Sequence, residues 1–306
     1  MGTHTLARSA WLILGYLLFV IVWGAWVRIS FSGNGCGDHW PLCGGEVVPT
    51  APSLKTIIEF THRLTSGLGL IAVGWLVWRI FKTTEAGHAA RPAAVGCVGF
   101  ILAEAALGAA LVKFELVGQD DSVARGVVVA LHLVNTLSFT AFGAMTAYRL
   151  EYPKAAPWTG RLALVLRLGL VGLVITGMTG AVTALGDTLF PVAPGESGDL
   201  LTRIREDATA GQHFLIRLRF IHPVIAALVA LGIAWTAAWF VATARSPQVV
   251  RLARRLLGLL AVQVVLGVVT IALAAPAWLQ LSHLLMAQLT WITFVVLGAA
   301  ASDEKP

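Results

Sequence analysis

Long apolar runs with few charged positions dominate the chain. Eight stretches of roughly 20 or more mostly apolar residues follow one another, and that length is enough to cross a bilayer as an α-helix. They do not show the apolar–polar alternation that a membrane barrel requires. The expected spans are residues 8–30, 56–81, 92–114, 124–149, 158–184, 211–244, 249–274 and 276–301. The first run is long enough to stay as a helix rather than be removed as a signal peptide.

The composition agrees with a membrane protein. Of the 306 residues, 57% are hydrophobic and 12% are charged, whereas soluble domains carry about 25% charged residues. The net charge of +6 is typical of some nucleic-acid-binding proteins, but the basic residues lie in short loops between apolar runs. We therefore expect contact with membrane lipid and no nucleic-acid partner. The expected fold class is an all-α polytopic membrane protein with eight transmembrane helices.

The distribution of Lys and Arg predicts the orientation in the membrane, because cytoplasmic loops carry an excess of both residues. More than half of the 22 basic residues fall on one side of the expected spans. They are Arg8, Arg79, Lys82, Arg91, Arg149, Lys154, Arg161, Arg245, Arg251, Arg254, Arg255 and Lys305. Both termini are therefore expected in the cytoplasm, with the longer loops outside, in a multi-pass protein of the cell membrane.

The two halves of the chain resemble each other, which indicates an internal duplication. Residues 59–62 in the second span match residues 219–222 in the sixth, and both segments end in histidine. The other matches pair Glu104 with Gln263 and His132 with His283. The offsets of 160, 159 and 151 residues are nearly constant. Residues 1–150 and 151–306 are therefore expected to form two pseudo-symmetric four-helix bundles.

Each even-numbered span carries one histidine well inside the membrane: His62, His132, His222 and His283. Ionisable residues in membrane helices are rare and indicate functional sites. The four fall at a similar depth, in the outer half of the expected bilayer. Two imidazoles per bundle suit a haem iron bound from both faces. A single such histidine would more often serve packing. Zinc is a weaker alternative, because no cluster completes four ligands.

The halves differ beside their histidines. Glu59 stands three residues before His62, whereas Arg219 stands three residues before His222, and this spacing places each on its histidine's face. Glu59 is suited to accept a proton, or simply to pair with a neighbouring basic residue. Arg219 and Arg217 suit haem propionates. The N-terminal half is therefore expected to carry the reaction, and the C-terminal half a permanent cofactor.

Residues 31–55 form the expected first outer loop, which is rich in turn-forming residues. Cys36 and Cys43 would face the oxidising side, where disulfides persist. A bridge between them would rigidify a lid over the N-terminal bundle. Alternatively, the pair passes electrons by thiol–disulfide exchange. Both roles stay open from the sequence, and zinc binding would need further ligands that are not evident.

Together these features resemble the haem A synthase family over nearly the whole chain. The most specific elements are the Glu59-x-x-His62-Arg63 motif and the Cys-x6-Cys loop around Trp40. The resemblance implies a membrane oxidoreductase that converts the C8 methyl group of haem O to a formyl group, giving haem A for terminal oxidases. The reaction is similar to two successive hydroxylations followed by loss of water from a geminal diol.

The resemblance also implies site residues. His62 and His132 would take the substrate haem O, with Glu59 needed for activity, whereas His222 and His283 would hold a haem b. Some members carry a second cysteine pair in the outer loop of the C-terminal half. Residues 185–210 contain no cysteine, so a mechanism that needs that pair is in question here.

Three other interpretations compete with the synthase. A membrane cytochrome b-type electron-transfer protein explains the four histidines equally well. It does not explain why Glu59 of one half is matched by Arg219 in the other, or why the cysteine loop lies over the N-terminal half alone. A haem carrier would need one exchangeable haem and no Glu59. A transporter is disfavoured because no inverted repeat is evident. A haem O synthase is the expected partner, and a homo-oligomer stays open.

Overall fold

The structure is a computed structural model that describes residues 2–157, 159–192, 209 and 211–304. Apart from an isolated bridge between Cys43 and Glu46, the regular structure of these residues is helical. The helices are α1 (Thr3–Ile29), α2 (Leu54–Thr83), α3 (Ala90–Lys113), α4 (Val123–Glu151), α5 (Gly160–Leu189), α7 (Phe214–Thr243), α8 (Pro247–Ala272) and α9 (Ala277–Asp303). All eight are long and apolar enough to cross a membrane, so the expected fold class is confirmed.

Serine residues fix where several helices begin. The Ser53 hydroxyl accepts a hydrogen bond from the Thr56 amide at the start of α2, and the Ser122 hydroxyl accepts one from the Arg125 amide at the start of α4. Such caps satisfy amides that have no partner within the helix. Beyond the caps, the apolar runs continue as helices because a helix satisfies its own backbone groups inside a bilayer.

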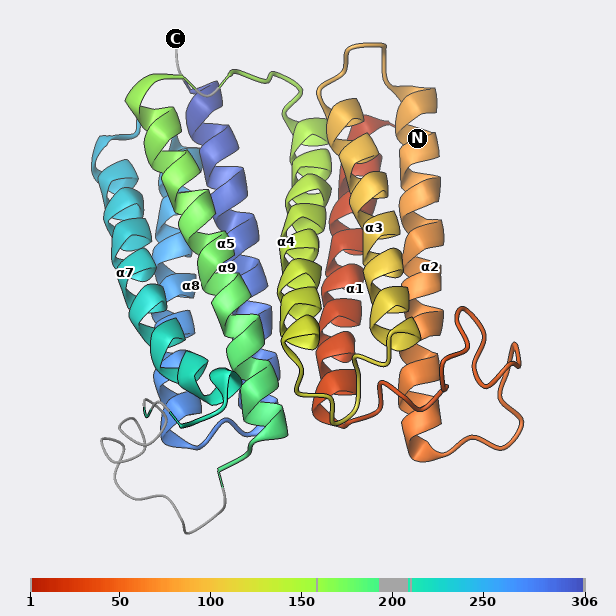
Figure 1. Ribbon diagram of the computed structural model, residues 1–306. Coiled ribbons are helices and arrows are strands. Elements are labelled where there is room, and N and C mark those ends of the chain that lie inside the picture. Colours follow the sequence, from red (N-terminus) through yellow and green to blue (C-terminus); the bar gives the residue numbers. More distant parts are fainter. Residues whose placement is uncertain (1, 158, 193–208, 210, 305–306) are drawn as a thin grey trace.

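The helices form two four-helix bundles that lie side by side (Figure 1). In the N-terminal bundle α1 contacts α2 and α4, and α3 contacts the same two helices. In the C-terminal bundle α7 contacts α5 and α8, and α9 contacts the same two helices. The bundles meet mainly through α4, which packs against α5 and α9. Both chain termini lie at one end of the molecule, and the loop between α1 and α2 lies at the other, here called the loop end.

Polar contacts join the two bundles in the core. Thr140 Oγ1 of α4 donates to Gln288 Oε1 of α9 at 3.1 Å, and the Gln288 side chain is only 1% exposed. Nearer the termini, Arg149 forms an ion pair of 2.5 Å with Asp303. Buried polar groups are costly without partners. These contacts therefore favour one register of the two halves and keep their histidines at one level.

Candidate functional site

The four intramembrane histidines lie at matching positions in the bundles. They follow the first residue of α2, α4, α7 and α9 by eight, nine, eight and six residues, which is about 9–14 Å along the helix axis. His62 and His132 lie on the diagonal helices of the N-terminal bundle, and His222 and His283 on those of the C-terminal bundle. The two histidines of each pair stand at one level of the same bundle. The structure thus brings together the two predicted pairs, one within each bundle.

Glycines of α1 and α5 lie against the His62 and His222 rings. A Cβ atom added to Gly24 of α1 would lie 2.8 Å from Cε1 of His62, and one added to Gly180 of α5 would lie 2.9 Å from Cε1 of His222. Real Cβ atoms do not approach other atoms so closely, so both rings need glycine beside them. The sequence analysis missed these glycines. Their offset of 156 residues, close to that of the histidines, is the signal that reveals them.

The two bundles hold these rings differently. Thr179 Oγ1 lies 3.1 Å from Nδ1 of His222, one residue before the glycine that faces the same ring. In the N-terminal bundle the matched position is Trp23, and Nδ1 of His62 is buried with no hydrogen-bond partner among the described residues. A partner on the second nitrogen fixes the orientation of a ligating imidazole. Nδ1 of the His222 ring therefore has a polar partner, whereas Nδ1 of the His62 ring has none among the described residues.

The second histidine of each pair contacts the matched residue of the preceding helix. Oε2 of Glu104 lies 2.5 Å from Nε2 of His132, and its Oε1 accepts a hydrogen bond of 2.8 Å from Asn135. In the C-terminal bundle Nε2 of Gln263 lies 3.1 Å from Nε2 of His283. The Glu104 carboxylate, which lies inside a membrane helix, thus has both His132 and Asn135 as partners. Among the described residues, a carboxylate contacts the N-terminal pair, whereas an amide and a hydroxyl contact the C-terminal pair.

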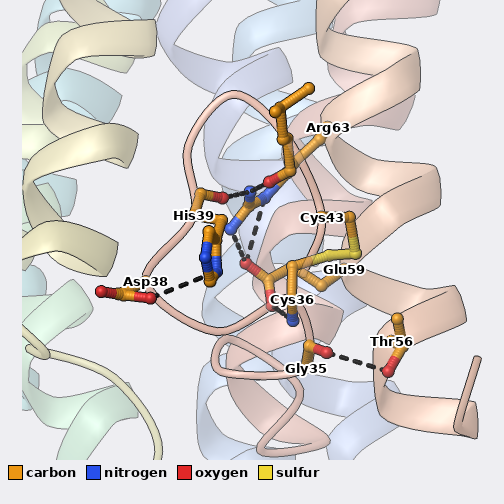
Figure 2. A network of polar contacts seen from close by, with 9 residues as sticks. Gly35, Cys36, Asp38, His39, Cys43, Thr56, Glu59 and Arg63 are labelled. Atoms are coloured by element: carbon orange, nitrogen blue, oxygen red, sulfur yellow. Dashed lines mark hydrogen bonds and ion pairs between the residues drawn. A yellow bond between two sulfur atoms is a disulfide. The ribbon is translucent and has the colours of Figure 1, made fainter. Parts of the chain in front are cut away.

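Glu59 lies one turn nearer the loop end than His62, under the first loop (Figure 2). Its side chain is 3% exposed, and Oε2 accepts a hydrogen bond of 2.8 Å from the Cys36 amide. Its Oε1 accepts from Nη2 and Nε of Arg63 at 2.5 and 3.1 Å. The pairing with a basic neighbour that the sequence left open is therefore present. The carboxylate also connects α2 directly to the cysteine loop.

The cysteine loop folds over this end of α2. Cys36 and Cys43 are buried and joined by a disulfide, as Figure 2 shows. Arg63 Nη1 donates hydrogen bonds to the carbonyl oxygens of His39 and Leu42 at 2.5 and 2.6 Å. One guanidinium thus contacts Glu59 and two loop carbonyls. The loop is held both by its covalent bridge and by a buried ion pair.

The predicted propionate-binding arginines have other contacts in this structure. Arg219 Nε lies 2.7 Å from Asp187 Oδ1, whereas Arg217, two residues earlier on α7, is exposed. Arg28 of α1 reaches the other bundle, where its Nη2 lies 3.3 Å from Gln280 Oε1. Several guanidinium groups therefore gather at the loop end, close to the level of the histidines.

The residues present fit a planar, iron-containing macrocycle. Nδ1 of His62 and Nδ1 of His283 are buried without a hydrogen-bond partner in the described part of the chain. Such a nitrogen is costly unless it binds a further group. Diagonal helices place one imidazole on each side of a bundle axis, and glycines beside three of the rings leave room against the helix backbone. This is the donor set that haem proteins use for iron.

Comparison with known proteins finds relatives over most of the chain. Residues 7–295 match the family described as COX15-CtaA, cytochrome oxidase assembly protein. A Thermus thermophilus protein named protoheme IX farnesyltransferase is 43% identical over 302 residues, 98% of this chain and 49% of that relative. The chain thus spans about half the length of this relative. The heme A synthase of Halalkalibacterium halodurans is 30% identical over 237 residues, 72% of each chain. That of Macrococcus caseolyticus is 38% identical over 131 residues, 42% of this chain and 41% of the relative.

Proposed function

Because the chain belongs to the COX15-CtaA family of cytochrome oxidase assembly proteins, we propose that it is a haem A synthase, which oxidises the C8 methyl group of haem O to a formyl group. The observation that carries this proposal is a pair of histidines at one level on the diagonal helices of each bundle. The relatives named heme A synthase support it. The chain is a multi-pass membrane protein, and we place its termini in the cytoplasm of a cell-membrane enzyme.

We assign a different haem to each bundle. His222 and His283 hold a resident haem b, which supplies one-electron chemistry when bound. His62 and His132 bind the substrate haem O. The contact between Thr179 and His222 supports this division, because a ligand fixed by a second partner binds more firmly. His62 has no such partner among the described residues, which suits a site that must release its product.

Two carboxylates belong to the N-terminal bundle alone at matched positions. Glu59 is matched by Arg219 and Glu104 by Gln263. Conversion of a methyl group to a formyl group removes four electrons and adds one oxygen atom, so it needs an external oxidant and an oxygen source. A carboxylate near the substrate can take up the protons that leave the carbon as it is oxidised. We assign this role to the Glu59 carboxylate and the positioning of His132 to Glu104. The disulfide-closed loop above Glu59 then excludes water, and Arg217 and Arg219 serve propionates at the loop end.

The substrate identifies the preceding reaction. Haem O carries a farnesyl-derived side chain, so a farnesyl-transfer reaction on haem b must supply it. The Thermus thermophilus relative is named protoheme IX farnesyltransferase and is about twice as long as this chain. We propose that a haem O synthase works beside this protein in the same membrane.

Co-expression with a haem O synthase under aerobic conditions tests the function. Haems extracted from the membranes, identified by chromatography and mass, are expected to include haem A only when this chain is present. Haem b and haem O bound to the chain without any haem A would instead identify an electron-transfer cytochrome. Formation of haem O by this chain alone, from haem b and farnesyl diphosphate, would identify a farnesyltransferase.

Substitution of Gly180 by Ala is expected to lower haem retention in the C-terminal bundle about tenfold. The added methyl group would lie 2.9 Å from the His222 ring, and overpacking of this kind costs about 1–3 kcal/mol. The measurement is the haem-to-protein ratio of the purified protein. Gly232→Ala on α7, where an added Cβ meets nothing within 4 Å, is the matched control. Equal haem content in both variants would refute the close approach.

A further inference from the structure

The N-terminal bundle contains an internal apolar cavity of about 10 Å³. Residues of α1, α2, α3 and α4 line it, and among them are Val73 and Gly143. These two lie eleven residues beyond His62 and His132, which is about 16 Å along the helices toward the end that carries the termini. The cavity therefore lies on the bundle axis, below the histidine pair as seen from the loop end.

The matched region of the C-terminal bundle is filled. With the offset that relates His132 to His283, Gly143 corresponds to Phe294. The Phe294 side chain is 1% exposed and packs against α5, where a Cβ on Gly169 would lie 2.4 Å from its Cζ. One bundle thus has a large aromatic ring where the other has no side chain.

Four further lining positions follow the same trend. By the offsets of their own helices, the N-terminal bundle has the smaller residue at each of these four positions. The pairs are Ala10 with Leu166, Val73 with Ile233, Cys97 with Leu256 and Thr146 with Leu297. The larger members belong to one buried cluster together with Phe294.

Three lining positions change in the opposite direction. They are Ile13, Leu76 and Val77, matched by Gly169, Thr236 and Ala237. The space at Gly169 is occupied by Phe294, so this exchange does not open the C-terminal core. Of the eight lining positions that differ in size, five, Gly143 among them, thus carry the smaller residue in the N-terminal bundle.

This difference matches the difference between the two haems assigned above. Protein interiors are normally close-packed, and cavities reduce stability. Haem O differs from haem b by a long farnesyl-derived chain, which needs an apolar path inside a bundle. We propose that this chain of the substrate runs from the histidine level along the axis of the N-terminal bundle into the space beside Gly143. The small residues there select the farnesylated haem.

The proposal rests on the proposed function for the identity of the substrate. The space described is about the size of one water molecule, so entry of the chain displaces the flexible side chains of Leu14 and Leu17 that line it. Small residues allow this movement, whereas Phe294 and Leu166 would block it in the C-terminal bundle. The same block accounts for a C-terminal site that takes a haem without the chain.

Binding titrations of haem O and haem b to the purified protein test the proposal. In Gly143→Phe, which copies Phe294, we expect haem O to bind about tenfold or more weakly, because apolar burial of the chain is lost. Haem b binding is expected to stay within about twofold. Thr146→Leu, a milder filling, is expected to act in the same direction. The control is Leu102→Phe on α3, which adds bulk at a side chain that is 52% exposed.

Each outcome separates the proposals. Equal weakening of both haems, or unchanged affinity for haem O in both filled variants, would overturn the path for the chain. The spectrum of the haem at His222 and His283 reports whether a variant is folded. Haem A formation that is unchanged by filling would refute the path and leave the synthase intact. If the unsubstituted protein forms no haem A, the synthase is refuted. Selective loss of haem O binding in its filled variants would then still support the path.

Discussion

Replacement of Glu59 by Gln is expected to lower haem A formation by about 10²-fold or more, the usual contribution of a positioned proton acceptor. Glutamine has nearly the same shape, and its Oε1 can still accept the hydrogen bond from the Cys36 amide. It neither takes up a proton nor pairs ionically with Arg63. The measurement is haem A yield in membrane extracts, normalised to the haem b and haem O retained by the protein.

Two comparisons separate chemistry from loop anchoring. Glu59→Ala removes both functions and is expected to lower haem retention as well, whereas Glu59→Gln leaves it unchanged. Haem A formation at the wild-type level in Glu59→Gln would show that Glu59 holds the loop and takes no part in the chemistry. The double substitution Cys36→Ser and Cys43→Ser is expected to keep most haem A formation, because Arg63 still holds the loop carbonyls. Complete loss in that variant would indicate redox-active cysteines.

The sequence is enough to predict the fold because the physical constraint of a bilayer is strong. Apolar length alone locates all eight helices, and most ends agree within a few residues. The larger errors lie at polar ends. α1 begins at Thr3 rather than at residue 8, because Thr3, His4 and Thr5 are helical although they are polar, and α5 extends to Leu189, past the apolar run. Polar residues in an interfacial turn remain helical, so hydropathy cannot locate where such helices end.

The sequence predicts those site residues that are unusual in a membrane helix, but not the residues that contact them from neighbouring helices. The four histidines are conspicuous in apolar helices, and Glu59 with Arg63 has the spacing of an ion pair on one helix face. Gly24 and Thr179 act on histidines of neighbouring helices, and no spacing along the chain encodes such contacts. Packing brings them together. The internal duplication is the one signal that could have found them, by comparison of the halves residue by residue.

Replacement of His222 by Ala is expected to remove the resident haem b and, with it, haem A formation. The imidazole is one of two proposed axial ligands, it is held by Thr179, and alanine offers no substitute. Haem b content, measured from the reduced absorption spectrum, is expected to fall to about a tenth or less, since even loss of a ligand's supporting partner costs about 10–100-fold. His213→Ala, at the cap of α7, is the control and should keep the spectrum.

The matched substitution in the N-terminal bundle, His62→Ala, tests whether the two bundles bind different haems. His62→Ala is expected to keep haem b and lose haem O, because its histidine belongs to the proposed substrate pair of the N-terminal bundle. Both variants then form no haem A, but for different reasons that the retained haem identifies. Loss of the same haem from both variants would contradict the division into a resident and an exchangeable site. The division requires haem b to depend on His222 and haem O on His62.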